Sequence, residues 1–174
     1  MRSSAARPNH LVAKSTDGGL TWSTPVVAGN VPGSSAFFSS ITVAPDGTVD
    51  VVFQALTDVP AGTAPGPGVV SYDSYLTQLA DQGATWSSPV TISTASSDPD
   101  GSSTNSLRAQ FLADYITAVA DSLHMYAVWT DSRNATPGAA VDAFRAGTGP
   151  KPDVITRCPT TFGNTEIFIG IVSP

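Results

Sequence analysis

The chain has 174 residues, a formal net charge of −6 at neutral pH and only 13% charged residues, while Gly, Pro, Ser and Thr are abundant. Two lysines and six arginines, scattered along the chain, exclude the basic stripe that a nucleic-acid partner requires. No apolar run approaches the ~20 residues of a membrane helix, so no membrane span is expected. This composition is typical of a turn-rich, all-β secreted protein. The polar N-terminal segment, with no hydrophobic stretch after it, indicates no signal peptide in this chain.

The N-terminal part predicts a β-hairpin. A strand is expected over residues 10–14, followed by the turn sequence STDGGLTW and a second strand that begins at Pro25. The carboxylate of Asp17 is expected to accept hydrogen bonds from backbone N–H groups two or three residues further on. Gly19 supplies a positive φ, and the indole of Trp22 covers the apolar underside of the turn while its N–H finds a polar partner.

Residues 41–53 predict a second hairpin, with an Asp-Gly turn between its strands. The apolar residues Val49, Val51 and Phe53 alternate with their neighbours, which favours a strand with one buried face. Residues 111–120 followed by residues 124–129 have the same form, with residues 119–129 aligning with residues 43–53, and predict an equivalent hairpin.

The turn motif occurs a second time in residues 81–86, with the sequence DQGATW. A strand is expected before it over residues 69–77, and Pro89 begins the strand after it, as Pro25 does after the first copy. An internal repeat of this kind indicates a fold assembled from copies of one supersecondary unit.

The pattern Ser-x-Asp-x-Gly-x-Thr-Trp resembles the Asp-box, the bacterial neuraminidase repeat of sialidase-like β-propellers. The first copy matches every position, and the second has Leu79 where Ser is usual. In that family the box joins the third and fourth strands of a blade, at the rim and away from the binding face. The resemblance therefore implies a structural role for six residues. These are Asp17, Gly19, Trp22, Asp81, Gly83 and Trp86.

The resemblance implies an all-β fold, a six-bladed β-propeller of antiparallel four-stranded sheets. Residues 10–30 are then expected to end one blade, residues 36–93 to form a complete blade, and residues 108–172 to give three strands of a further blade, with a Gly- and Pro-rich insertion at residues 134–164. Two, four and three strands do not close a ring. Residues 1–174 are therefore expected to be one partial propeller domain of about two to three blades, and the remaining blades to come from sequence outside this chain.

The candidate site residues also follow from a resemblance. In secreted sialidase-like proteins a Gly-Asp-Tyr-Ile strand precedes a Trp-Thr-Asp-x-Arg strand end, and here Ala113 stands in the Gly position. Asp114 and Tyr115 are then expected on an innermost strand near the central channel. Arg133 is expected at one mouth of the ring, where it and Arg108 would bind a substrate carboxylate. Each candidate also has a structural alternative. Asp114 could be a hydrogen-bond acceptor in a turn, Tyr115 a packed aromatic ring, and Arg133 the partner of Asp131 in an ion pair.

The catalytic set of the sialidases does not map onto the chain. Those enzymes use a Tyr nucleophile activated by a Glu, an Asp acid/base and three arginines. The single glutamate, Glu166, lies on an expected strand, where a solvent-facing role is favoured, and the Arg-Ile-Pro motif of the family is absent. The catalytic residues are therefore unknown, with Asp114, Tyr115 and Arg133 as the candidates.

The remaining polar motifs favour structural interpretations. Residues 98–101 (DPDG) match only half of a calcium loop, so a plain turn is preferred, and His10 and His124 are too isolated for zinc. No metal or cofactor is expected. Cys158 has no second cysteine to pair with and is interpreted as a buried or spare thiol. Asn134 begins a glycosylation triplet of a kind that is common by chance.

Two functions remain open from the sequence. The first is glycoside hydrolysis of the exo-α-sialidase type at the channel mouth of the complete protein, with this chain inactive alone. The second is a non-catalytic, extracellular Asp-box propeller that binds glycan or protein. Both hypotheses imply a glycan or glycoconjugate partner and a secreted or cell-surface location.

Overall fold

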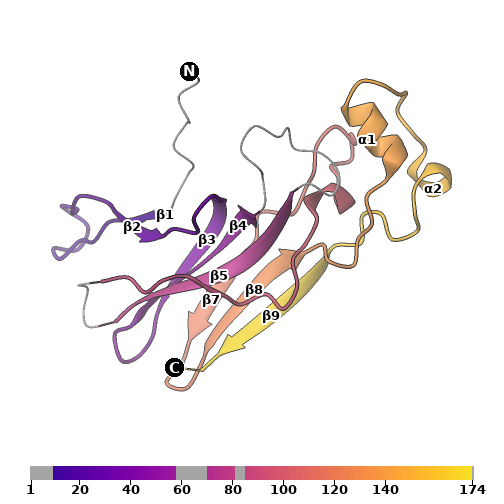
Figure 1. Cartoon of the computed structure of the whole chain (residues 1–174). Helices are drawn as coiled ribbons and strands as arrows, with labels where there is room; N and C mark the ends of the chain where they lie inside the picture. Colours follow the sequence, from indigo (N-terminus) through magenta and orange to yellow (C-terminus); the bar gives the residue numbers. More distant parts are fainter. Residues whose placement is uncertain (1–9, 58–69, 81–84, 174) are drawn as a thin grey trace.

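The computed structural model describes residues 10–57, 70–80 and 85–173, which form three antiparallel sheets of two, four and three strands (Figure 1). The strands are β1 (His10–Val12), β2 (Val26–Gly29), β3 (Ser35–Val43), β4 (Val49–Thr57), β5 (Ser71–Leu79), β6 (Val90–Thr91), β7 (Thr117–Ala120), β8 (Met125–Asp131) and β9 (Glu166–Val172). The helices are a 3-10 turn at Pro99–Gly101 and the short α-helices α1 (Ala139–Arg145) and α2 (Val154–Arg157).

The sheets are β1-β2, β3-β4-β5-β6 and β7-β8-β9 in strand order. The described chain is therefore mostly β, which confirms the predicted class, and the predicted strand numbers of two, four and three are confirmed as well. None of the helices in the described part is long and apolar enough to cross a membrane.

One local prediction is wrong: the strand expected over residues 111–120 begins only at Thr117, the first residue of β7. Ala113 has a left-handed φ of 58°, and outside a bulge a strand does not pass through such a residue. The two α-helices lie within residues 134–164, the expected insertion, beyond one end of the sheets (Figure 1).

The first turn motif forms a closed hydrogen-bond ring around Asp17. The Ser15 hydroxyl donates to its carboxylate at 2.8 Å, and the backbone N–H and hydroxyl of Thr21 donate at 2.9 and 2.6 Å. The Thr21 hydroxyl, then its N–H and the Ser15 hydroxyl, lower the pKa of Asp17 to about 2. Gly19 has the predicted positive φ, and its carbonyl accepts from the indole N–H of Trp22 at 3.2 Å.

The backbone contacts of this turn extend one residue beyond the prediction, and the indole lies elsewhere than predicted. The Leu20 N–H, three residues on, lowers the pKa of Asp17 slightly, while the Thr21 N–H, four residues on, donates to its carboxylate at 2.9 Å. The ring of Trp22 is exposed, so it does not cover an apolar underside in this chain. The turn is thus held by polar contacts to the carboxylate and not by burial of the indole.

The two hairpins that carry the repeated motif share one pattern of backbone contacts. In the first, Ser23 N–H donates to the Lys14 carbonyl at 2.9 Å and the Ser23 hydroxyl accepts from Lys14 N–H at 3.0 Å. In the second, Ser87 and Gln78 make the same two bonds at 2.8 and 2.9 Å. The sequence repeat is therefore also a structural repeat at its described flanks.

Part of the second motif lies outside the described residues. Asp81 and Gly83 are among the residues that the structure does not describe. Trp86 is described: it pairs with Leu79 across an isolated β-bridge and packs, half-buried, against the apolar cluster that contains Phe53.

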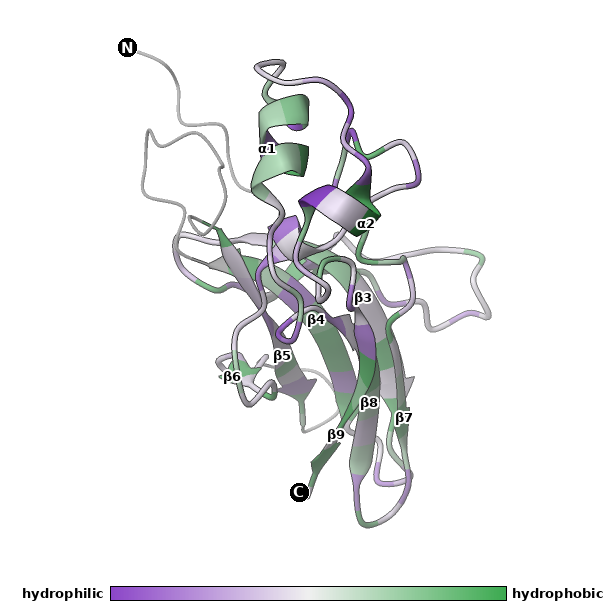
Figure 2. Cartoon of the chain, turned by 90° about the vertical axis from the view of Figure 1, so that its right-hand side faces the viewer, coloured by the Kyte–Doolittle hydropathy of each residue, from purple (hydrophilic) through white to green (hydrophobic). Residues whose placement is uncertain are grey.

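The central sheet is covered on both faces. Val52 and Leu76 pack on one side with Ala127 and Trp129 of the β7-β8-β9 sheet. On the other side Phe53 belongs to a cluster with Ala28 of β2. Figure 2 shows the hydrophobic residues running along these strands. The sheet β3-β4-β5-β6 thus lies between the other two, and the prediction of a single buried face for β4 is wrong because Val52 is as buried as Phe53.

The outer face of the β7-β8-β9 sheet is apolar and exposed. On β9, Ile167, Ile169 and Ile171 alternate with half-buried residues, and each is about 60% exposed. The ring of Trp129 packs on the inner face, where a Cβ at Gly170 would come within 2.9 Å of it. The strand therefore has apolar side chains on both faces, which is typical of a strand with a partner sheet on each side.

The hairpin β1-β2 contacts the central sheet through the side chain of His10. Its ring lies 4.8 Å from that of Phe53, and its buried Nε2 has no hydrogen-bond partner among the described residues. Burial lowers the pKa of His10 from its ordinary value of 6.5. Protonation would place an unpaired charge between the two sheets.

We expect the stability of the chain to fall as the pH drops below 6.5. The unfolded chain then binds more protons at His10 than the folded chain, so the unfolding free energy decreases until the lowered folded-state pKa is passed. Urea unfolding curves between neutral pH and about pH 5 measure this dependence. A His10→Leu variant should reduce it, whereas a His124→Asn variant should retain it. Equal pH dependence in His10→Leu and the unmodified chain would contradict the assignment.

Candidate functional site

A polar network lies at the end of strand β8. The carboxylate of Asp131 is buried. It accepts hydrogen bonds from the Ser97 hydroxyl at 2.6 Å and from the Trp129 indole N–H at 3.2 Å. Arg133 donates to the same carboxylate through its backbone N–H, Nε and Nη2, at 2.9, 2.9 and 2.6 Å. Burial raises the pKa of Asp131, but the bonds from Arg133 and Ser97 outweigh it and hold the pKa below its ordinary value.

The guanidinium of Arg133 is held by groups of this chain. Besides the bidentate contact with Asp131, its Nη1 donates to the Thr94 hydroxyl at 2.7 Å, and its Cζ lies 4.1 Å from the ring centre of Phe168. The structure therefore shows the ion pair that the sequence left as the alternative to a substrate clamp. A bidentate pair of this kind orients an arginine firmly.

Two further arginines, Arg108 and Arg145, make contacts in or beside the insertion. Arg108 is exposed, with its guanidinium 5.0 Å from the ring centre of Phe144 on α1. Arg145, which the sequence did not single out, donates to the Ser102 carbonyl at 2.6 Å and lies 3.5 Å from the carboxylate of Asp100. It fastens α1 to the preceding loop, and no local sequence pattern identifies such a long-range contact.

Asp114 and Tyr115 lie in the segment before β7 and not on the strand itself. Both side chains are exposed, Tyr115 at 81%. The residue before them, Ala113, has the left-handed φ of 58°. Glycine adopts this conformation without strain, and glycine is the residue expected here from the sialidase-like pattern. The pair was predicted on an innermost strand, but β7 begins two residues after Tyr115, so that prediction is wrong. The left-handed φ at Ala113 is a conformation that suits the glycine of the sialidase-like pattern.

Asp114 lines an open pocket between the two larger sheets, of about 260 Å³. Its walls come from the start of β3, the end of β4 and the segment before β7. The lining residues are Phe37, Phe38, Leu56, Gln110, Phe111, Leu112 and Asp114. Three phenyl rings and one carboxylate therefore converge at the same end of two neighbouring sheets. We call this the aromatic pocket.

The β3 strand bends at the aromatic pocket. Its pairing with β4 shifts register between Phe37 and Ser39, so that Phe38 is the extra residue of a bulge with a φ of 38°. Phe38 and Ala113 are two of the three non-glycine residues with positive φ in the described chain. Bulges and left-handed residues concentrate at sites where a fold positions side chains for function.

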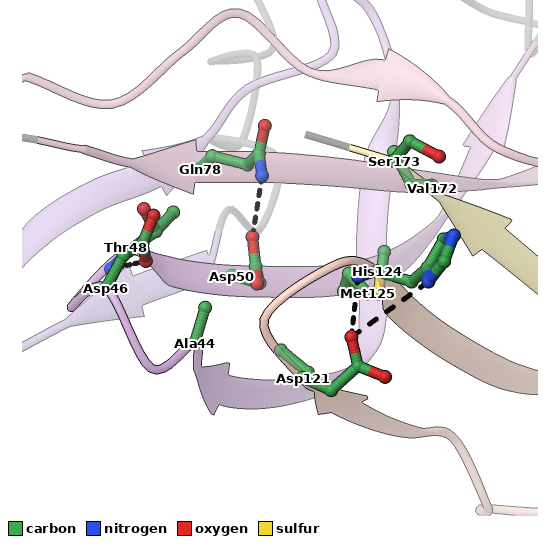
Figure 3. A pocket seen from close by; sticks show the side chains of 11 residues that line it. Ala44, Asp46, Thr48, Asp50, Gln78, Asp121, His124, Met125, Val172 and Ser173 are labelled. Atoms are coloured by element: carbon green, nitrogen blue, oxygen red, sulfur yellow. Dashed lines mark hydrogen bonds and ion pairs between the residues drawn. The ribbon is translucent and has the colours of Figure 1, made fainter.

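A second hollow lies at the opposite end of the sheets, between the β3-β4 and β7-β8 turns (Figure 3). Its polar groups are bonded to one another: Asp50 accepts from Gln78 at 2.8 Å, Asp46 from Thr48 N–H at 2.9 Å, and Asp121 from a turn N–H at 2.7 Å. Burial raises the pKa of Asp50. A cavity of about 50 Å³ has room for only a few water molecules, so we assign this hollow a structural role.

The weaker sequence candidates occupy structural positions. The loop at residues 98–101 is a 3-10 turn capped by Asp98, and the described residues contain no cluster of three or more metal-ligating side chains. Glu166 accepts from the Asn134 amide at 2.7 Å. Cys158 is half-buried and unpaired, and burial raises the pKa of its thiol.

No protein-family model matches the chain, and no curated protein matches it. A functional assignment therefore rests on the duplicated hairpin, the packing of the sheets and the geometry of the aromatic pocket.

Replacing Arg133 by Ala should destabilise the chain by about 3 kcal/mol or more, because the buried carboxylate of Asp131 loses its charged partner. Urea unfolding measures this loss. An Arg108→Ala control, which removes only an exposed contact with Phe144, should cost no more than about 1 kcal/mol. Adding Asp131→Asn to Arg133→Ala should recover part of the loss. Equal unfolding free energies for the two arginine variants would contradict the proposed ion pair.

Replacing Ala113 by Gly should stabilise the chain by about 0.5 kcal/mol or more, because relief of the left-handed strain exceeds the added chain entropy of the unfolded state. The measurement is the midpoint of thermal unfolding. An Ala95→Gly control at an exposed bend without positive φ should instead lower the midpoint. A lower midpoint for Ala113→Gly would show that the backbone at this position is not left-handed in solution.

Proposed function

We propose that this chain is part of a sialidase-like Asp-box β-propeller, with β1-β2 as the end of one blade, β3-β4-β5-β6 as a whole blade and β7-β8-β9 as three strands of the next. The observation that supports this most strongly is the duplicated hairpin, in which the pairs Lys14–Ser23 and Gln78–Ser87 make equivalent hydrogen bonds. The hydrogen-bond ring around Asp17 adds the turn chemistry of the box.

The packing of the sheets supports the same proposal. Each of the three sheets faces its neighbour through an apolar layer, and the central one is covered on both faces. The exposed isoleucines of β9, Ile167, Ile169 and Ile171, continue this series outward and would pack on a further blade. The remaining blades are proposed to come from sequence outside the 174 residues.

The proposed activity is glycoside hydrolysis of the exo-glycosidase type by the complete protein, in a secreted or cell-surface location. The aromatic pocket carries this part of the proposal, because it lies where the neighbouring strands β3 and β7 begin and contains the exposed carboxylate of Asp114. The ends of such strands around the axis of a propeller are where ligands bind. Asp114 is the group proposed for proton transfer.

A second candidate is a non-catalytic propeller that binds glycan, and two contacts favour it. Arg133 is paired with Asp131, and Glu166 is bonded to Asn134. Neither the arginine nor the one glutamate of the chain is therefore free for the roles that these residue types have in sialidases.

The two candidates differ in turnover. We expect the complete protein to release 4-methylumbelliferone from at least one fluorogenic glycoside, and the 174-residue chain to release none. In the complete protein, Asp114→Asn should lower kcat/KM on the order of 100-fold. Asp121→Asn, at the opposite end of the sheets, is the control and should leave kcat/KM unchanged. Binding to glycans on an array with no release from any glycoside would favour the second candidate.

A further inference from the structure

The structure points to a neutral pyranose, and not an acidic sugar, as the ligand of the aromatic pocket. This inference rests on the proposal that glycans bind at this end of the sheets, and it specifies their chemical class. It follows from three properties of the pocket: its apolar walls, its bent backbone and its charge.

The walls of the pocket present aromatic rings. Phe37 and Phe38 lie edge to face, with ring centres 5.1 Å apart at an interplanar angle of 69°. Phe111 lines the pocket from the segment before β7, and 52% of its surface is exposed. The C–H-bearing face of a pyranose packs on aromatic rings in this way, because it is apolar while its hydroxyls project from the edge. Exposed aromatic surface beside a polar group is typical of a binding site.

The backbone holds these rings in place. Phe37 packs against the buried ring of Tyr72 with centres 5.9 Å apart, so it is anchored from behind. Phe38 follows at the bulge of β3, which directs consecutive side chains to the same pocket rather than to opposite faces of the sheet. The phenyl pair is therefore a fixed feature of the strand and not a mobile loop element.

The charge of the pocket selects against an acidic ligand. Among its lining residues the one charged side chain is Asp114. The amide group of Gln110 is neutral and is oriented by the hydrogen bond that it donates to Asp100. None of the described arginines lines the pocket: Arg145 lies beside Asp100, Arg133 pairs with Asp131, and Arg108 lies over Phe144. Among the described lining residues a sugar carboxylate would thus meet a like charge and no cation, whereas a neutral sugar can donate its hydroxyls to the Asp114 carboxylate.

A nuclear magnetic resonance titration of the 174-residue chain tests the ligand class directly. Methyl β-D-galactopyranoside and the methyl α-glycoside of N-acetylneuraminic acid are compared at the same millimolar concentrations. The neutral glycoside should shift the amide signals of residues 37, 38 and 110–114, and the acidic one should not shift them. Shifts at these residues with the acidic glycoside alone, or with neither glycoside, would overturn the inference.

Three variants separate the contributions of the rings and the charge. Phe111→Ala should weaken binding of the neutral glycoside about fivefold. Leu123→Ala, at an exposed apolar residue in the β7-β8 turn, should not change it. Asp114→Lys should weaken the neutral glycoside about tenfold and give binding of the acidic one, whereas Asp121→Lys should do neither. An unchanged preference in Asp114→Lys would remove the electrostatic explanation.

The proposed function and this inference fail in different ways. If the acidic glycoside binds at the aromatic pocket, the glycan-binding proposal stands and the inferred ligand class is wrong. If neither glycoside shifts the pocket signals, and the complete protein hydrolyses no fluorogenic glycoside, the proposed function fails with it.

Discussion

Strand β4 has protein on both of its faces: every side chain from Asp50 to Ala55 is buried, and adjacent residues belong to different apolar clusters. A strand in this situation requires a sheet on each side, since neither face can be left to water. The β1-β2 hairpin and the β7-β8-β9 sheet meet that requirement. Gln54 strengthens one of the two contacts, because its buried amide donates to the Thr130 carbonyl of β8 at 3.1 Å.

The two ends of this layered arrangement are built differently. At one end, Asp46 and Asp121 close short turns by accepting backbone N–H groups, and little space remains between them. At the other end the connections are longer, and Phe38 and Ala113 adopt conformations that cost free energy. Regular turns fix the sheets, and the strained end forms the aromatic pocket. This division of roles is common where loops carry function on a rigid scaffold.

Local chemistry made the hairpins predictable, because an Asp-Gly turn flanked by alternating apolar residues specifies both turn and strands. Contacts between distant residues were not predictable. The alternation at Val49, Val51 and Phe53 predicted that the residues between them face solvent. Val52 is buried instead, because the β7-β8-β9 sheet, which follows much later in the chain, covers that face. Helix α1 has seven residues, too few to show a helical period, and it is fastened by Arg145. The aromatic pocket was missed because only one of its polar residues matched a motif.

The isoleucines Ile167, Ile169 and Ile171 of β9 link folding to assembly. Covering three such side chains contributes on the order of 5 kcal/mol, which is comparable to the whole net stability of an ordinary domain. A surface that packs on this strand would therefore set the melting temperature of the chain as strongly as its own core does. In the proposed complete propeller, the unfolding free energy would therefore include the contact of β9 with its neighbouring blade as well as the core of this chain.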